Sequence, residues 1–204
     1  MIEYVIAENP DDRVLRRASE LIKKGELVCI PTDTNWVVIA DPFSKQGVEK
    51  IYKFKNVDKL HHFSLLCDSI SRASEVALID DSIFKILRRI TPGHFTFIFE
   101  ATKKITKAVQ ANKMDHQVGI RFIPSTLVEK LLAVHGEVVM STNIDYAKYG
   151  LDEDNVYSYQ IEEAIGNSLQ MIIDPGEYEF AGQSTIVDFT SGAAEIIRQG
   201  VGKL

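Results

Sequence analysis

The sequence predicts a mixed α/β fold, in which a twisted sheet is flanked by helices, as a single domain over residues 1–204. Short apolar runs of strand length alternate along the chain with amphipathic segments of helix length. These segments do not follow a strict strand–helix–strand period, which favours a sheet with both parallel and antiparallel pairs. No linker rich in Pro, Gly or Ser and no internal repeat divides the chain, so one domain is the preferred count.

The first two helices are indicated by their caps as well as by their periodicity. Asn9 and Pro10 suit the start of a helix, because Asn caps helices and Pro fits their first turn. Gly25 is expected to end this helix. Ser44 is expected to cap a second helix that ends near Lys55.

The remaining elements are predicted from the spacing of apolar residues, which differs between strands and helices. Alternating or continuous apolar runs between turn residues indicate strands, and apolar residues three and four apart indicate helices. A polar stretch in the last third of the chain is interpreted as a long loop. The predicted strands cover 27–30, 36–40, 63–67, 95–99, 118–123, 137–140, 171–173, 185–189 and 194–198, the helices cover 81–90 and 126–134, and the loop covers 145–159.

Composition limits the classes of function. With 45% hydrophobic and 25% charged residues, the chain is typical of a globular protein. The formal net charge of −6 argues against nucleic-acid binding through bulk charge, although it allows a local basic patch. Two cysteines exclude a disulfide framework, and the longest apolar run, at 36–40, is too short to cross a membrane. We therefore expect a cytoplasmic protein with no membrane partner.

Polar residues follow two of the predicted strands. The segment 31–34 (PTDT) comes directly after one apolar strand, and 141–143 (STN) comes after another. Strand ends of this kind often bind ligands in open α/β sheets. The same residues also suit an ordinary turn, in which their side chains bond only to their own backbone. These residues alone leave both interpretations open.

Cations occupy two other segments. The lysines at 50, 53, 55 and 59, followed by His61 and His62, suit either phosphate binding or a solvated helix face. Arg121 alternates out of a β-branched strand, where it would meet either a ligand anion or an internal acid. The two histidines have no clustered ligand partners, so no metal site is assigned to protein side chains. The chain also lacks a glycine-rich phosphate-binding loop, so a nucleotide would need another kind of site.

Taken together, these segments resemble the YrdC/YciO family of threonylcarbamoyl-AMP synthases over nearly the whole chain. The family's P-T-D-T-x-Y-G-L block resembles 31–38, and its I-Y-K-x-K-x-R stretch followed by P-L-S-L-L resembles 51–66. The sequence of residues 62–68 (HFSLLCD) resembles the YciO branch more closely than the YrdC branch. The family's P-G-x-x-T, V-G-x-R-x-P, S-T-I-V-D and I-x-R-x-G patterns are similar to 92–96, 118–124, 184–188 and 196–200.

The resemblance implies a YrdC/RibB-like fold with a concave, positively lined ligand cavity. It also implies an enzyme that joins L-threonine, bicarbonate and ATP into threonylcarbamoyl-AMP for the t6A modification of tRNA, with Mg²⁺ accompanying the ATP. By this analogy Lys55 and Arg121 would be catalytic. Thr34, Arg121 and Ser141 would contact threonine, and Lys55, Lys59, Asn143, Ser184 and Arg198 would contact the nucleotide.

The sequence departs from the family pattern where phosphates would bind. Val57 replaces an arginine and Asp145 replaces an asparagine, so a cation is lost and a carboxylate is gained. Trp36 replaces a tyrosine and so loses a hydroxyl, while His94 stands where proline is common and is interpreted as neutral. The resemblance therefore implies a synthase with weakened or altered activity.

Two alternatives stay open. One is an RNA- or nucleotide-binding protein on the same scaffold without synthase turnover, and the other is a protein for a different small anionic metabolite. For RNA, local basic patches would come from 50–62 and from Arg88, Arg89, Lys103, Lys104 and Lys107.

Overall fold

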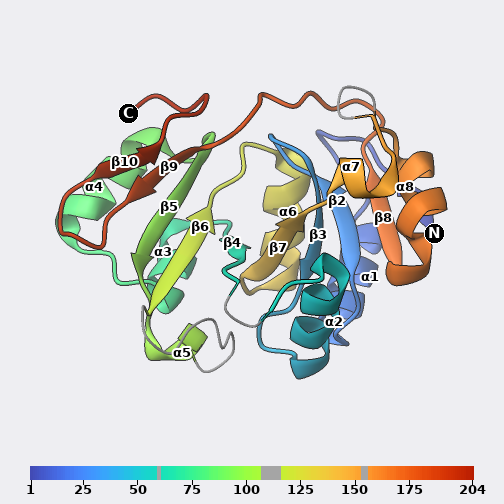
Figure 1. Cartoon of the computed structure of the whole chain (residues 1–204), viewed down its shortest axis with the longest axis horizontal. Helices are drawn as coiled ribbons and strands as arrows, with labels where there is room; N and C mark the ends of the chain where they lie inside the picture. The colour runs from blue at the N-terminus through green and yellow to red at the C-terminus, as the bar shows by residue number, and fades with distance from the viewer. Residues whose placement is uncertain (59–60, 107–115, 153–155) are drawn as a thin grey trace.

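The computed structural model describes residues 1–58, 61–106, 116–152 and 156–204, whose strands form one ten-stranded sheet (Figure 1). Most strands overlap the apolar runs that predict them, and each of the runs 28–31, 36–40 and 171–174 is buried throughout. The strands are β1 (Ile2–Tyr4), β2 (Val28–Pro31), β3 (Trp36–Ala40), β4 (Ser64–Leu66), β5 (Phe95–Glu100), β6 (Gln117–Arg121), β7 (Val139–Asn143), β8 (Met171–Asp174), β9 (Thr185–Asp188) and β10 (Glu195–Arg198).

The sheet is mixed, which confirms the predicted fold class. Its order is β1-β8-β2-β3-β7-β4-β6-β5-β9-β10. β8 runs parallel to both β1 and β2, β4 runs parallel to β6, and β5 runs parallel to β9, whereas the other neighbours are antiparallel. Because Phe95 pairs with Thr185, the predicted motifs at 92–96 and 184–188 lie side by side.

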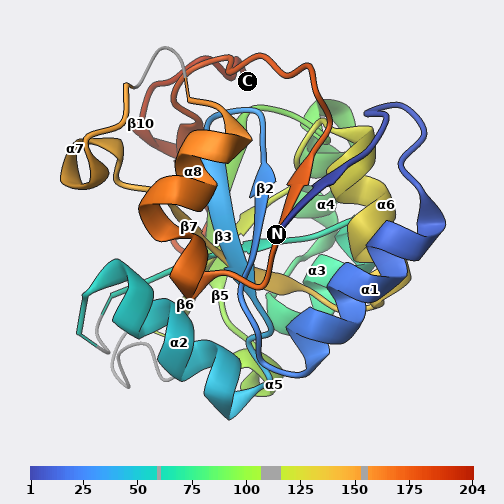
Figure 2. The same cartoon turned by 90° about the vertical axis from the view of Figure 1, so that its right-hand side faces the viewer.

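Helices cover both faces of the sheet (Figure 2). α1 (Asp12–Lys23) and α6 (Thr126–His135) pack together on one side of β2 and β3, while α2 (Lys45–Lys55) and α8 (Ser158–Ile165) lie on the other. The other helices are α3 (Ile70–Val76), α4 (Asp81–Ile90), α5 (Lys103–Thr106) and α7 (Tyr146–Tyr149), with a 3-10 turn at Gly166–Ser168.

Two apolar clusters hold these layers together. The smaller cluster joins α1 and α6 to the sheet through fully buried side chains such as Leu15, Ile22 and Leu131. The larger cluster joins α2, α3, α4 and α8 to the opposite side chains of the strands, and Trp36 and Phe97 are among its fully buried members. Each large side chain buried in this way contributes roughly 1.5–3 kcal/mol to folding.

Short polar side chains begin the helices, although not always at the predicted residue. Ser44 accepts a hydrogen bond from the backbone N–H of Gly47 and caps α2, as predicted. The predicted cap Asn9 is wrong, because Asp11 accepts the backbone N–H of Arg13 at 2.8 Å and α1 begins at Asp12. A carboxylate at this point also interacts favourably with the positive end of the helix dipole.

The long loop predicted at 145–159 is wrong in part. α7 occupies 146–149 and α8 begins at Ser158. The backbone carbonyl of Val156 accepts hydrogen bonds from Trp36 Nε1 at 3.2 Å and from the Tyr178 hydroxyl at 2.6 Å. These tertiary contacts hold Val156 in place, in a stretch whose polar composition indicates a loop.

Candidate functional site

A cavity of about 820 Å³ lies where β4, β6 and β7 meet the turn after β2 and the segment that follows β8. Most of its walls are polar. The side chains used below come from six parts of the chain, namely the turn 34–35, the end of α2, the strands of the sheet, the cap of α7, the segment 180–184 and β10. They are Thr34, Asn35, Lys55, Thr96, Arg121, Ser141, Asn143, Asp145, Phe180, Gln183, Ser184 and Arg198.

The PTDT segment forms a tight turn, in which some side chains stabilise the turn and another lines the cavity. The Thr32 hydroxyl donates to the backbone carbonyl of Asn35 at 2.8 Å and accepts the N–H of Thr34, so Thr32 shapes the turn. Asp33 is buried and points away from solvent toward Arg121. Thr34 lines the cavity. The turn interpretation is therefore confirmed for Thr32, and ligand binding by Thr34 stays a prediction.

Arg121 is the last residue of β6 and its side chain is 7% exposed. Its Nη2 donates to Asp33 Oδ1 at 2.6 Å and its Nη1 donates to Thr34 Oγ1 at 3.2 Å. Burial lowers the pKa of Arg121, the Asp33 carboxylate raises it, and the nearby Arg198 lowers it. Arg121 thus makes the internal ion pair that the sequence left as one alternative, and it also lines the cavity.

Two buried polar atoms in this wall have no hydrogen-bond partner among the described residues. They are Nε of Arg121, which is a donor, and Oδ1 of Asn35, which is an acceptor. Buried polar groups in folded proteins are nearly always paired, and leaving one unpaired costs about 1–3 kcal/mol. The residues that carry this donor and this acceptor both line the cavity, so the wall beside a bound ligand holds a spare donor and a spare acceptor.

Small residues keep the sheet clear beneath the cavity. Ser141 of β7, Ser64 of β4 and Gly119 of β6 are register partners across three adjacent strands. The Ser141 hydroxyl donates to the Ser64 carbonyl at 3.0 Å. Ser141 and Asn143 lie inside β7, which corrects the prediction that the strand ends before them. Larger side chains at these positions would fill the space that a ligand needs.

Ser184 and Arg198 form a second polar wall at β9 and β10. Arg198 donates from Nη2 to the Ser184 carbonyl at 2.8 Å, and the Ser184 hydroxyl lies 2.9 Å from Thr96 Oγ1. Gly200 allows the chain to pass close by, because an added Cβ would overlap the Gln183 carbonyl. The structure therefore brings Ser184 and Arg198 together, as their assignment to one subsite predicts.

Lys55 reaches the cavity from the last residue of α2. Its Nζ donates to the backbone carbonyl of Asn143 at 3.0 Å. Partial burial lowers the pKa of Lys55, the Asp145 carboxylate raises it, and the nearby Lys148 lowers it. Asp145 also caps α7 by accepting the backbone N–H of Lys148, so its carboxylate is already partnered. Lys59, the other predicted phosphate ligand, lies outside the described residues.

The structure explains three of the departures from the family pattern. Val57 packs against the larger apolar cluster and is not among the described residues that line the cavity. The indole of Trp36 is fully buried and stacks edge-on against Tyr178, with ring centres 5.0 Å apart. His94, interpreted above as a neutral replacement, contacts a buried carboxylate, since its Nδ1 lies 2.8 Å from Asp33 Oδ2.

The segment between β8 and β9 supplies cavity residues that the sequence reasoning missed. It crosses one end of the sheet (Figure 1), and the backbone N–H of Ala181 donates to the Asp33 carbonyl at 2.7 Å. Phe180 and Gln183 on this segment line the cavity. No motif marks either residue, because their positions depend on this long-range crossing.

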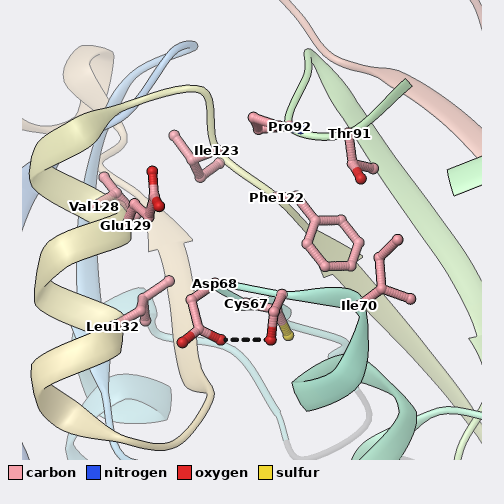
Figure 3. A pocket seen from close by; sticks show the side chains of 11 residues that line it. Cys67, Asp68, Ile70, Thr91, Pro92, Phe122, Ile123, Val128, Glu129 and Leu132 are labelled. Carbon is pink, nitrogen blue, oxygen red and sulfur yellow. Dashed lines mark hydrogen bonds between the residues drawn. The ribbon is translucent and has the colours of Figure 1, made fainter. Parts of the chain in front are cut away.

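A smaller cavity of about 250 Å³ lies between α6 and the start of α3 (Figure 3). Asp68 lines it, but this carboxylate already accepts hydrogen bonds from Arg72 Nε at 3.0 Å and from the Ser69 hydroxyl at 3.2 Å. Most of the other walls are apolar, and Phe122 and Leu132 are examples. Glu129 also lines this cavity, but no Lys, Arg or His is among the described residues around it, so the smaller cavity is the weaker candidate for binding an anion.

Other charged groups are engaged elsewhere. Lys50 forms an ion pair with Glu26, and Lys104 forms ion pairs with Glu75 and Glu137. Lys107 lies outside the described residues. Within the described ranges, no group of three or more His, Cys, Asp or Glu side chains is placed to hold a metal ion. In the same part of the chain, no helix is both long enough and apolar enough to cross a membrane.

Comparison with known proteins shows the family. The family model Sua5_yciO_yrdC, described as telomere recombination, matches residues 20–200. YciO of Escherichia coli strain K12, an uncharacterised protein, is 26% identical over 201 residues, which cover 98% of this chain and 95% of YciO. The crystal structure of E. coli YciO has a TM-score of 0.85 at 25% identity, covering 100% of this chain and 97% of that chain.

More distant relatives carry the name of an enzyme. A putative threonylcarbamoyl-AMP synthase of Methanocaldococcus jannaschii is 24% identical over 198 residues, with coverage of 97% of this chain and 91% of the relative. Pyrococcus abyssi Sua5, solved in complex with L-threonine, has a TM-score of 0.83 at 20% identity over 97% of this chain and 57% of that one, a likeness of fold. The motifs, the sheet and these comparisons agree, and the chain belongs to the Sua5/YciO/YrdC family.

Proposed function

We propose that this protein binds L-threonine and ATP in the larger cavity and joins them with bicarbonate to form threonylcarbamoyl-AMP, the intermediate of t6A modification of tRNA. The proposal is carried by Arg121, whose buried Nε has no hydrogen-bond partner within the described part of the chain and whose side chain lines a cavity together with Lys55 and Arg198. A buried guanidinium with a spare donor suits a carboxylate, and the other cations suit phosphates.

The cavity residues would divide between the two substrates. Arg121, Thr34 and Ser141 would bind threonine, with Arg121 holding its carboxylate. Lys55, Asn143, Ser184 and Arg198 would bind the nucleotide, and Lys59 belongs to the same proposed set. The two sets line one cavity, so the amine of threonine and the α-phosphate of ATP would be held close together within it.

The proposed reaction has two steps. The threonine nitrogen attacks the carbon of bicarbonate, and water leaves to give a carbamate. An oxygen of the carbamate then attacks the α-phosphorus of ATP, and the bond to pyrophosphate breaks. The protein's contribution would be to position the reactants and to neutralise the charge that develops on the phosphates.

Mg²⁺ would enter as part of the MgATP substrate. Asp145 is the one carboxylate among the described residues that line the cavity. Mg²⁺ commonly binds through one or two carboxylates together with substrate phosphates. This donor set fits a metal ion held mainly by the nucleotide, whose positive charge would also reduce repulsion between Asp145 and the phosphates.

The test is a synthesis assay with labelled bicarbonate. The purified protein is incubated with MgATP, L-threonine and ¹³C-bicarbonate, and the products are separated by liquid chromatography with mass detection. We expect a ¹³C-labelled threonylcarbamoyl-AMP and pyrophosphate, formed only when all three substrates are present. Arg121→Lys keeps the charge beside Asp33 but removes Nε, and should lower the rate by about 10²–10³.

Arg88→Lys is the matched control, because Arg88 is exposed on α4 and is not among the described residues that line the cavity. It should leave the rate unchanged. Absence of labelled product from the wild-type protein would refute the proposal. If threonine and ATP still bound in that case, the alternative of a binding protein on the same scaffold would be favoured.

A further inference from the structure

His94, Asp33 and Arg121 form a chain of contacts that leads from the surface into the cavity wall. The His94 side chain is 37% exposed, whereas those of Asp33 and Arg121 are 4% and 7% exposed. His94 Nδ1 contacts Asp33 Oδ2 at 2.8 Å, and Arg121 Nη2 contacts Asp33 Oδ1 at 2.6 Å. The two oxygens of one buried carboxylate therefore have different partners.

The backbone around His94 is held firmly. The Gly93 N–H donates to the Phe122 carbonyl at 3.0 Å, and the Thr185 N–H donates to the His94 carbonyl at 3.0 Å. These bonds tie His94 to the segment after β6 and to the start of β9. The imidazole is thus presented to Asp33 from a fixed position, across 61 residues of sequence.

The way in which Asp33 holds Arg121 is unusual in one respect. Arginine and a carboxylate commonly pair through two parallel N–H···O bonds that use both oxygens. Here Asp33 receives a single bond from Arg121, since its second oxygen is occupied by His94. As a result Nε of Arg121 is left without a partner among the described residues. If the second oxygen were released, Asp33 would be able to turn and take Nε as well.

We propose that His94 is a positioning residue for the amino-acid end of the cavity, which keeps Arg121 Nε available to the substrate carboxylate by holding the second oxygen of Asp33. This inference rests on the proposed function, in which Arg121 binds the carboxylate of threonine. The contact needs a proton on Nδ1, which the charged ring and one neutral tautomer both carry. A proline, common at this position in the family pattern, has no such donor.

The test compares two variants of His94. His94→Leu removes the donor at similar size, and His94→Asn keeps an N–H group near the position of Nδ1. Calorimetry should show that His94→Leu weakens L-threonine binding by about 10- to 100-fold, the usual loss for a hydrogen bond to a charged group. His94→Asn should bind threonine within about threefold of the wild type, and ATP binding should stay the same in all three proteins.

A second measurement does not depend on the substrate. The ¹⁵N resonance of Arg121 Nε, assigned by its loss in Arg121→Lys, should shift in His94→Leu and become protected from hydrogen exchange, because Asp33 then binds it. His94→Asn should keep the wild-type signal. An unchanged Nε signal in His94→Leu would overturn the inference, and so would parallel weakening of ATP and threonine.

The outcomes separate this inference from the proposed function. A wild-type protein that binds threonine but forms no product refutes the proposed reaction, while the binding of threonine by the His94 variants still decides the role of His94. A wild-type protein that does not bind threonine overturns the inference together with the threonine part of the proposed function.

Discussion

Removing the Arg121 side chain is expected to destabilise the fold, because Asp33 would be left as a buried charge. The two side chains are 7% and 4% exposed and their closest atoms are 2.6 Å apart. At this distance, with an effective dielectric of about 20, the attraction is about 6 kcal/mol. Desolvation cancels part of it, and breaking a buried pair on one side typically costs about 3–5 kcal/mol. Because Asp33 keeps its contact with His94, we expect the free energy of unfolding to fall by about 3 kcal/mol, the lower end of this range.

The assay is urea unfolding followed by the fluorescence of Trp36, the single tryptophan of the chain, which is fully buried. For an m-value of about 2 kcal/mol per M, Arg121→Met should lower the midpoint by about 1.5 M. The double variant Asp33→Asn with Arg121→Met leaves no buried charge and should recover a large part of this loss. A loss below about 1 kcal/mol in the single variant, or a double variant less stable than the single one, would refute the reasoning.

Three other sites offer separate tests. Burial lowers the pKa of His135, so the unfolded chain binds a proton more readily, and the urea midpoint should fall as the pH drops below the unfolded value of about 6.5, with a flatter profile in His135→Asn. Gly200→Ala should lower the melting temperature, whereas Gly166→Ala, where an added Cβ meets only a flexible side chain 3.2 Å away, should change it little. Lys55→Met should weaken ATP binding by about 10-fold or more in calorimetry, and the exposed Lys53→Met should not; equal weakening would contradict the assignment of Lys55.

The sequence predicts best those helices and strands whose apolar residues are regularly spaced and whose ends are marked by turn or capping residues. β3 occupies 36–40 and α4 occupies 81–90, both as predicted. β1 and α8 escaped prediction for different reasons. β1 has three residues, too few to show a period, and it forms because β8 offers a parallel partner. α8 lies in a polar stretch and depends on packing against the larger cluster.

The candidate site was predictable where a residue type stands at a strand or helix end. Thr34, Arg121 and Ser184 all line the cavity that the resemblance implies, and their roles stay predictions. The contact between His94 and Asp33 was not predictable, because nothing local in the sequence relates residues that far apart. The same holds for Asn35, whose orphaned oxygen is a property of the folded turn.

The chain order of the strands has a consequence for how the protein folds. β1 is the first strand, yet it pairs with β8, so Ile2 cannot find its register partner until the chain has been folded as far as Ile172. β9 and β10 come last and supply Ser184 and Arg198, so the cavity closes only after β9 has docked beside β5. Pairings of such long sequence separation cost chain entropy before they return any contact energy, which makes them slow. Ligand binding should therefore be the last property to return on refolding, after the α1–α6 layer has regained its secondary structure.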